Sequence, residues 1–325
     1  MFIILTLVVV GTVLALIPHV IYIVMKLASL VGKFSVSYKP YGLCALGLFL
    51  VWVLMFLYGN KVGRFRSEVK EWVFDRKDVP EAFDGYRIVH ISDIHLDGWK
   101  GHEKELKDRV GEINELGADL ICFTGDLVSL SSSELNDFVN ILKCMNAKDG
   151  VVSILGNHDY MPYMRKSNAE RQKEVNEVVR IEREVLGWKL LMNENIIIRR
   201  DNDSIAIMGC ENQSVGAHPV IQRGDLRKTM EGTDGMFSIL LTHDPSRWRK
   251  EVVGKTDIPL TLSGHTHAMQ FKVFGFTPSK WAYPECDGWY EEGSQSLYVN
   301  IGLGGTMPMR LGATPEITCL TLRRK

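Results

Sequence analysis

The sequence predicts an α/β domain that is preceded by two membrane-spanning helices. From about residue 83 onward, short apolar runs of strand type alternate with helical stretches. Polar clusters close successive runs at intervals of about 30 residues, which is the length of a βαβ unit. Before that region, two long uncharged apolar stretches occupy most of residues 1–60.

The composition restricts the classes of partner. The chain has 325 residues and a formal net charge of −1. This balance argues against a protein that binds nucleic acid by neutralising its phosphates, so we expect no nucleic-acid partner. A small phosphorylated substrate stays compatible, because a local site can be positive inside a neutral protein. None of the 6 cysteines forms a CxxC pair, so no zinc-thiolate motif is visible. The cysteines do not resemble a disulfide framework, which favours a reducing compartment for the soluble part.

The two apolar stretches predict a multi-pass membrane anchor over residues 1–60. The first covers residues 2–25 and the second covers residues 41–58, and both are long enough to cross a bilayer. The first lacks the basic start and the small-residue cleavage site of a secretory signal. The alternative is a buried hairpin in the core of a soluble protein, but two such stretches in succession favour membrane spans.

Basic residues on both sides of the second span bear on its orientation. Two spans place the N-terminus and the large domain on the same side. The segment between the spans contains three lysines, and six basic residues follow the second span, namely Lys61, Arg64, Arg66, Lys70, Arg76 and Lys77. By the positive-inside rule we expect a protein of the cell membrane whose large domain faces the cytoplasm.

The large domain is predicted over residues 83–325, after a segment 61–82 that reads as a linker or as a strand leading into the domain. Its first half contains strands at 86–92, 119–124 and 151–155, with helices at 102–116 and 133–145 between them. Its second half contains a charged helix at 168–186, a hairpin of 196–198 with 205–208, and strands at 237–241, 260–262, 297–301 and 316–322. Ligands of such sheets gather at the carboxyl ends of the strands.

Polar residues that can bind metal follow these strands. They are Asp93, His95, Asp126, Asn157, His158, His243, His265 and His267. A single such Asp is usually a helix cap, but burying the whole set without a cation would be costly. Seven of the eight make sense as ligands of two divalent ions, with Asp126 as the natural bridging carboxylate. Oxygen and imidazole ligands without thiolate favour Mn, Fe or Zn over Mg or Ca.

Five sequence blocks resemble the calcineurin-like metallophosphoesterase family, and they occur in the family's order. The blocks are Asp93-Ile94-His95, Gly125-Asp126, Gly156-Asn157-His158-Asp159, His243 and Gly264-His265-Thr266-His267. The resemblance implies a four-layer αββα sandwich of two mixed sheets. It also implies that one ion is held by Asp93, His95, Asp126 and His267, and the other by Asp126, Asn157, His243 and His265.

The same resemblance implies roles for the two residues that follow Asn157. His158 matches a histidine that is not a ligand and that protonates the leaving oxygen or stabilises its developing charge. Asp159 matches the carboxylate that orients this histidine. Residues 297–300 and 310–313 further resemble a membrane-anchored branch of the family, although Ala268-Met269 stand where many members of that branch have a glycine pair.

The function implied is a membrane-anchored hydrolase that depends on two metal ions. It would cleave phosphoester or pyrophosphate bonds through attack of a metal-bridging hydroxide, and a phospholipid or a nucleotide-lipid fits an enzyme anchored beside lipid head groups. Soluble nucleotides or phosphoproteins are the alternative substrates. A catalytically weak, metal-binding membrane scaffold is the alternative to an enzyme, and the presence of every ligand position and of His158 favours the enzyme.

An aromatic segment follows the His-x-His block, from Met269 to Tyr290. Glycines and prolines interrupt it, so a looped excursion is favoured over a long hairpin. One interpretation is that its rings fill a second small core. The other is that some rings, with Lys272 and Lys280, form an apolar rim at the mouth of the site that faces membrane lipid.

Overall fold

The computed structural model describes residues 2–214 and 221–325. The described chain divides into two compact units. The helical unit comprises Met1–Arg64 together with Met307–Leu311, and the α/β unit comprises Phe65–Thr306 together with Gly312–Lys325.

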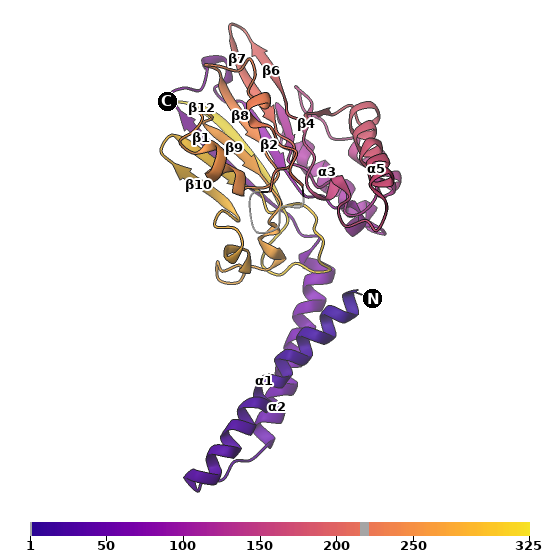
Figure 1. Cartoon of the computed structure of the whole chain (residues 1–325), viewed down its shortest axis with the longest axis vertical. Coiled ribbons are helices and arrows are strands. Elements are labelled where there is room, and N and C mark those ends of the chain that lie inside the picture. The colour runs from indigo at the N-terminus through magenta and orange to yellow at the C-terminus, as the bar shows by residue number, and fades with distance from the viewer. Residues whose placement is uncertain (1, 215–220) are drawn as a thin grey trace. The chain divides into compact units, whose positions relative to one another are not determined.

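The helical unit contains α1 (Phe2–Gly32) and α2 (Lys39–Tyr58), which run antiparallel to one another (Figure 1). Both are long and apolar enough to cross a membrane. The Trp52 indole N–H donates to the Leu7 carbonyl at 2.9 Å and ties the two helices together. α1 continues past its predicted end at residue 25, because the residues from 26 to 31 include no helix breaker.

Residues 307–311 belong to this helical unit although they lie near the C-terminus of the chain. The Arg310 N–H donates to the Gly59 carbonyl at 3.1 Å. Met309 is buried in a small apolar cluster with Trp52 and Phe56 of α2. The helical unit is therefore built from two distant parts of the sequence.

The α/β unit contains two six-stranded mixed sheets. The first has the order β1 (Glu68–Arg76), β12 (Glu316–Arg324), β2 (Arg87–Ile91), β3 (Leu120–Phe123), β4 (Val151–Ser153), β5 (Lys189–Leu190). The second has the order β10 (Gly288–Glu292), β11 (Gln295–Val299), β9 (Leu260–Ser263), β8 (Phe237–Leu241), β7 (Asp203–Gly209), β6 (Glu194–Arg200). The strands expected in both halves of the domain are present within these sheets.

Helices cover both outer faces, which gives the expected four layers. The first sheet carries α3 (Glu103–Glu115), α4 (Val139–Leu142) and α5 (Asn168–Arg180). Near the second sheet lie α6 (Leu226–Thr229) and the π-helical turn Trp248–Val252. Alternate residues of a strand serve different layers. Val89 packs with Leu106 of α3, whereas its neighbour Ile88 lies in the cluster between the sheets. On the far side, Leu240 packs against Trp248.

The segment 61–82 is not a linker, because it contains β1, the strand that was the alternative for this region. β1 pairs in parallel with β12, from Glu68 opposite Glu316 to Arg76 opposite Arg324. It is an edge strand, and Phe74 is its only buried side chain. An edge strand that buries so little lacks the apolar alternation by which strands are recognised in a sequence.

The helix predicted over 133–145 is shorter than expected. A 3₁₀ turn, Ser132–Asp137, comes first, and only Val139–Leu142 is α-helical.

The parallel strand pairs determine where a functional site can form. β2, β3 and β4 are adjacent and parallel, as are β8 and β9. Their carboxyl ends therefore place five loops close together.

Candidate metal centre

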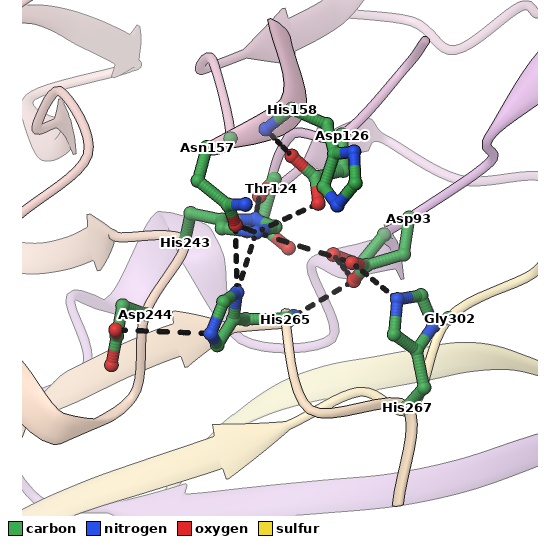
Figure 2. Close-up of polar contacts among 12 residues, drawn as sticks. Asp93, Thr124, Asp126, Asn157, His158, His243, Asp244, His265, His267 and Gly302 are labelled. Atoms are coloured by element: carbon green, nitrogen blue, oxygen red, sulfur yellow. Dashed lines mark hydrogen bonds and ion pairs between the residues drawn. The ribbon is translucent and has the colours of Figure 1, made fainter. Parts of the chain in front are cut away.

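The loops after these five strands bring together every metal-binding residue that the sequence predicts. Figure 2 shows the carboxylates of Asp93 and Asp126, the amide of Asn157 and four imidazoles facing a common centre. Three overlapping groups have ligand atoms within 4.8 Å of one another: Asp93–His95–His267, Asp126–His243–His265 and His95–Asp126–His158. The first two are parts of the two ligand sets implied by the family resemblance.

The backbone at these residues is unusual. Asp93, His95, Asp126, His265 and His267 have φ angles of 52°, 49°, 59°, 74° and 50°. Positive φ is uncommon outside glycine, and such strain concentrates where a surrounding structure holds functional groups in place. The left-handed turns direct these side chains, which come from different loops, toward one point.

The first ligand group lies around one oxygen of Asp93. Its Oδ2 accepts bonds from the Ser92 hydroxyl at 2.5 Å and from the His265 N–H at 2.9 Å. Its Oδ1 is buried and has no hydrogen-bond partner among the described residues. That oxygen lies 3.3 Å from His267 Nε2 and 3.8 Å from His95 Nε2, and these two nitrogens are 3.2 Å apart. Such a donor set, with one buried oxygen left over, fits a divalent cation.

The second group lies around His243. Its Nδ1 is 2.7 Å from the Thr124 carbonyl, which fixes the proton on Nδ1 and leaves the Nε2 lone pair for the centre. His243 Nε2 lies 3.2 Å from Asp126 Oδ2, 3.1 Å from Asn157 Oδ1 and 3.2 Å from His265 Nδ1. The second ligand group thus contains two imidazole nitrogens, from His243 and His265, and two oxygens, from the Asp126 carboxylate and the Asn157 amide.

Asp126 connects the two groups. Its Oδ2 is 3.2 Å from His243 Nε2 and 3.5 Å from His95 Nε2, one from each group. Its Oδ1 accepts the His158 backbone N–H at 2.7 Å, which fixes the carboxylate. Gly156 allows this approach, because a Cβ at that position would lie 2.2 Å from Asp126 Oδ1.

The charges of the centre are strongly coupled. Burial raises the pKa of Asp93 to about 6, against the opposing charge of His243. For Asp126 burial also acts upward, but the nearby imidazoles of His243 and His158 hold its pKa well below the usual range. Burial lowers the pKa of His243, yet Asp126, with contributions from Asp93 and the Thr124 carbonyl, more than offsets burial and raises that pKa to about 10. Without a cation, the site therefore keeps the Asp126 carboxylate and the His243 imidazolium in close contact.

The environment of His158 differs from the one expected. Its Nδ1 lies 2.8 Å from the Ser129 carbonyl, and its ring packs against His95 and Tyr163. The Asp159 carboxylate instead accepts the backbone N–H groups of Asp126, Leu127, Val128 and Gly156 at 2.8 to 3.1 Å. Burial, with a contribution from Asp126, raises the pKa of Asp159 to about 7.

The direct orienting role predicted for Asp159 is therefore corrected. In the part of the chain that the structure describes, its contacts are with backbone amides, and the Ser129 carbonyl orients the imidazole. Asp159 holds the loop that carries Asp126 against the loop that carries Asn157. Its position next to His158 in the sequence gave no information on the direction of its side chain.

Sequence reasoning also missed two groups beside His265. The Tyr283 hydroxyl lies 2.8 Å from His265 Nε2, and Asp244 Oδ2 lies 3.9 Å from the same nitrogen. Asp244 directly follows His243, so proximity in sequence could have suggested it. Tyr283 comes from the interrupted aromatic segment, and no spacing or periodicity identifies it.

Comparisons with known proteins agree with this geometry. Residues 86–269 match the family model described as calcineurin-like phosphoesterase. The metallophosphoesterase YkuE of Bacillus subtilis is 32% identical over 79% of this chain and 85% of its own length. A transmembrane protein with metallophosphoesterase domain from Danio rerio is 31% identical over 76% of this chain.

The chain spans only 55% of that Danio rerio protein and 62% of a 30% identical metallophosphoesterase from Campylobacter jejuni, which matches 76% of this chain. Among solved structures, a dimetal phosphatase from Danio rerio covers 69% of this chain and 90% of its own, with 10% sequence identity and a TM-score of 0.39. That similarity is too low to bear on function.

Proposed function

The chain belongs to the calcineurin-like phosphoesterase family, and on that premise we propose that it is a membrane-anchored hydrolase that uses two divalent metal ions to cleave phosphoester or pyrophosphate bonds. The observation that carries the proposal is Asp126, whose Oδ2 faces an imidazole of each ligand group. A single carboxylate in this position suits two ions held close together.

We assign the ligands by these groups. One ion would bind Asp93, His95, Asp126 and His267, and the other would bind Asp126, Asn157, His243 and His265. Nitrogen and oxygen donors without thiolate favour Mn, Fe or Zn. Bound there, the ions would lower the pKa of water until hydroxide forms and would neutralise charge on the phosphoryl oxygens.

The protein's own contribution to leaving-group departure is assigned to His158. The Ser129 carbonyl, 2.8 Å from Nδ1, accepts a hydrogen bond from the N–H at that nitrogen. Nε2 is then the atom at which the ring carries the proton that it gives to the leaving oxygen. Asp159 supports this arrangement indirectly, because it holds the backbone on both sides of the centre.

Membrane association restricts the substrate. Two helices of this chain can cross a bilayer, and relatives are named as transmembrane proteins. An enzyme tethered in this way meets lipid head groups at high effective concentration, which supports a phospholipid or nucleotide-lipid substrate over soluble nucleotides or phosphoproteins. We further propose a multi-pass arrangement with the catalytic unit in the cytoplasm; a reporter fused after Lys325 should be inaccessible to impermeant reagents in intact cells.

The test uses the purified full-length protein, stripped of metal and then loaded with Mn, Fe or Zn. At least one metal should restore hydrolysis of an aryl phosphodiester, and elemental analysis should find two ions per chain. A chelator should abolish this activity. Undiminished turnover in chelator would overturn the metal mechanism, and a fully loaded protein without turnover on any phosphoester would favour the scaffold.

A further inference from the structure

Residues 271–281, called here the aromatic loop, project from the α/β unit a few residues after the last candidate ligand, His267. Val273 and Phe276 pair through two backbone hydrogen bonds of 2.9 and 3.0 Å, which close a tight turn. Phe274 and Gly275 occupy its centre with φ angles of 50° and 77°. Gly or Asn is usual at such positions, so a bulky ring at the tip of this turn is a marked exception.

The tip presents its ring entirely to solvent. Phe274 is fully exposed, Trp281 is 80% exposed and Phe276 is 46% exposed. Phe276 and Trp281 pack against each other edge to face with 5.6 Å between their centroids. Exposed aromatic rings gathered in this way mark an interaction surface, because moving their apolar surface from water into contact with a partner is favourable.

The base of the aromatic loop is firmly held. Thr277 and Ser279 are buried, and the Thr277 hydroxyl donates to the Ala268 carbonyl at 2.6 Å. Tyr283, just beyond the loop, reaches His265 with its hydroxyl. The base of the loop is therefore held in place on both sides. Thr277 contacts Ala268, next to His267, and Tyr283 contacts His265.

The charge of the loop indicates the kind of partner. Residues 271–283 include no acidic side chain, and Lys280 is exposed beside Trp281. Lys272 forms an ion pair of 2.6 Å with Asp287 at the base. Aromatic rings with an adjacent lysine suit the bilayer interface, where the rings enter the acyl boundary and the ammonium group meets lipid phosphate.

The α/β unit is joined in the same chain to two helices that can cross a membrane, so a bilayer is close to it. Two helices can span a membrane, and the α/β unit begins at Phe65, a few residues after α2 ends at Tyr58. The chain re-enters the α/β unit at Gly312, which packs directly on the backbone of Lys272. A Cβ at Gly312 would lie 1.8 Å from the Lys272 carbonyl oxygen. The aromatic loop thus starts where the chain returns from the helical unit.

We propose that the aromatic loop inserts Phe274 and Trp281 into the phospholipid interface and so docks the catalytic unit on the bilayer beside its metal centre. This deepens the proposed function, on which it rests, because it selects a lipid-linked substrate that reaches the centre without leaving the membrane. Docking itself does not require catalysis, so the two ideas can fail separately.

The test places a spin label at the tip of the loop in the full-length protein, reconstituted in vesicles of phosphatidylcholine and phosphatidylglycerol. Cys44 and Cys144 are the exposed cysteines of the described chain, so the label is carried by Phe274→Cys in a Cys44→Ser/Cys144→Ser background. The matched control retains Cys144 as the labelled site, with Cys44→Ser alone. Collision rates with oxygen and with a water-soluble nickel chelate report the depth of each label.

Insertion predicts that the ratio of oxygen to nickel collisions is several-fold higher at position 274 than at Cys144. Equal ratios at the two positions would overturn docking on the bilayer. Low collision rates with both reagents at 274 would also overturn it, in favour of a contact with a second copy of the chain. Because Phe274 is fully exposed, its replacement should leave the melting temperature unchanged.

A second arm measures activity. Phe274→Ser/Trp281→Ser should raise the KM for a lipid-linked phosphoester in vesicles several-fold, whereas hydrolysis of a soluble aryl phosphodiester should be unaltered. Equal loss on both substrates would assign the rings to the structure of the site and contradict docking. Absence of both activities in the unsubstituted protein would contradict the proposed function and leave the spin-label result valid.

Discussion

The aromatic loop begins a few residues after His267, the last candidate ligand of the metal centre. Both regions contain strained backbone, but the strain turns their side chains in opposite directions. At the centre, left-handed residues such as Asp93 and Asp126 turn buried polar groups inward. At the loop tip, left-handed Phe274 turns an apolar ring outward. Between them, Ala268 and Met269 have φ angles of 48° and 49°. Strain alone therefore does not identify catalysis; the polarity and burial of the strained side chain indicate what it binds.

The left-handed backbone at Ala268 and Met269 also explains why many members of the membrane-anchored branch have glycines at these positions. A left-handed conformation costs roughly 1–2 kcal/mol per residue for an L-amino acid with a side chain. Glycine adopts it without that cost. This chain accepts the strain at both positions, next to His267, and the buried Ala268 packs with Ile301 and Ala313.

The largest expected effect comes from removing the charge that joins the two ligand groups. Asp126→Asn should lose bound metal and reduce phosphoesterase activity by more than about 100-fold, since even groups that only support a ligand cost 10–100-fold. Elemental analysis and turnover measure the two losses together. Asp97→Asn, at an exposed ion pair with Lys100, is the matched control. Full occupancy by two ions in the Asp126 variant would contradict the bridging role.

The next effect separates proton transfer from metal binding. His158→Ala should slow turnover by about 10²–10⁴-fold, as is typical when a general acid is removed. Both ions should stay bound, because His158 is outside the two assigned ligand sets. Substrates whose leaving group has a low pKa should show a smaller defect. If good and poor leaving groups are slowed equally, His158 is not the acid.

Two tryptophans test the contrast between a ring that packs against the core, Trp289, and an exposed ring, Trp281. Trp289 stacks on Phe74 with 5.9 Å between ring centroids and 3° between planes, and it also packs against Tyr298. Trp289→Ala should lower the free energy of unfolding by about 2–4 kcal/mol, whereas Trp281→Ala should change it by less than about 0.5 kcal/mol. Thermal or chemical denaturation measures both. Similar losses for the two variants would mean that the aromatic loop is part of the core.

A buried histidine without a ligand role gives the smallest predicted effect. His90 of β2 contacts Thr124 Oγ1 at 2.9 Å, and burial lowers its pKa to about 3. Because the unfolded chain binds a proton at His90 below about pH 6.5 and the folded chain does not, stability falls as the pH drops from 6.5 toward 3. Between pH 6.5 and about 5, this residue should account for about 2 kcal/mol of that loss.

The measurement compares unfolding curves of the unsubstituted protein and His90→Gln at several pH values. The variant should be less sensitive to acid over this interval, although its stability at neutral pH can differ. Identical pH dependence in the two proteins would show that His90 is not the group that titrates. The candidate metal ligands contribute to both curves, so the difference between the two curves isolates His90.

The parts of the fold that can be predicted are those whose burial leaves a pattern in the sequence. β2, β3 and β8 are short, mainly apolar runs, and the predicted strands match them within one or two residues. β10 begins at Gly288 within the aromatic segment, and β5 has only two residues. Neither carries a periodicity that distinguishes a strand from a loop, so the sequence does not predict them.

The residues of the centre are predictable because each follows a strand and because their chemistry is unusual as a set. How they are held is not predictable. The group that orients His158 is a backbone carbonyl, at Ser129, which every residue possesses. The role of Asp159 depends on which way one carboxylate turns, and that direction is set by amides from another loop. Contacts of this kind depend on three-dimensional packing and have no signature in the sequence.

The grouping of residues 307–311 with α1 and α2 has a practical consequence for separating the enzyme from its membrane segment. The polypeptide crosses between the two units at three points, near residues 64, 306 and 311. Proteolysis between residues 64 and 65 would break one crossing and leave two. A recombinant fragment that starts at Phe65 would keep Met309 and Leu311 but lose Trp52 and Phe56, the rings that cover them. Such a fragment should be prone to aggregation through this newly uncovered strip, and replacing Met309 and Leu311 with polar residues should restore its solubility.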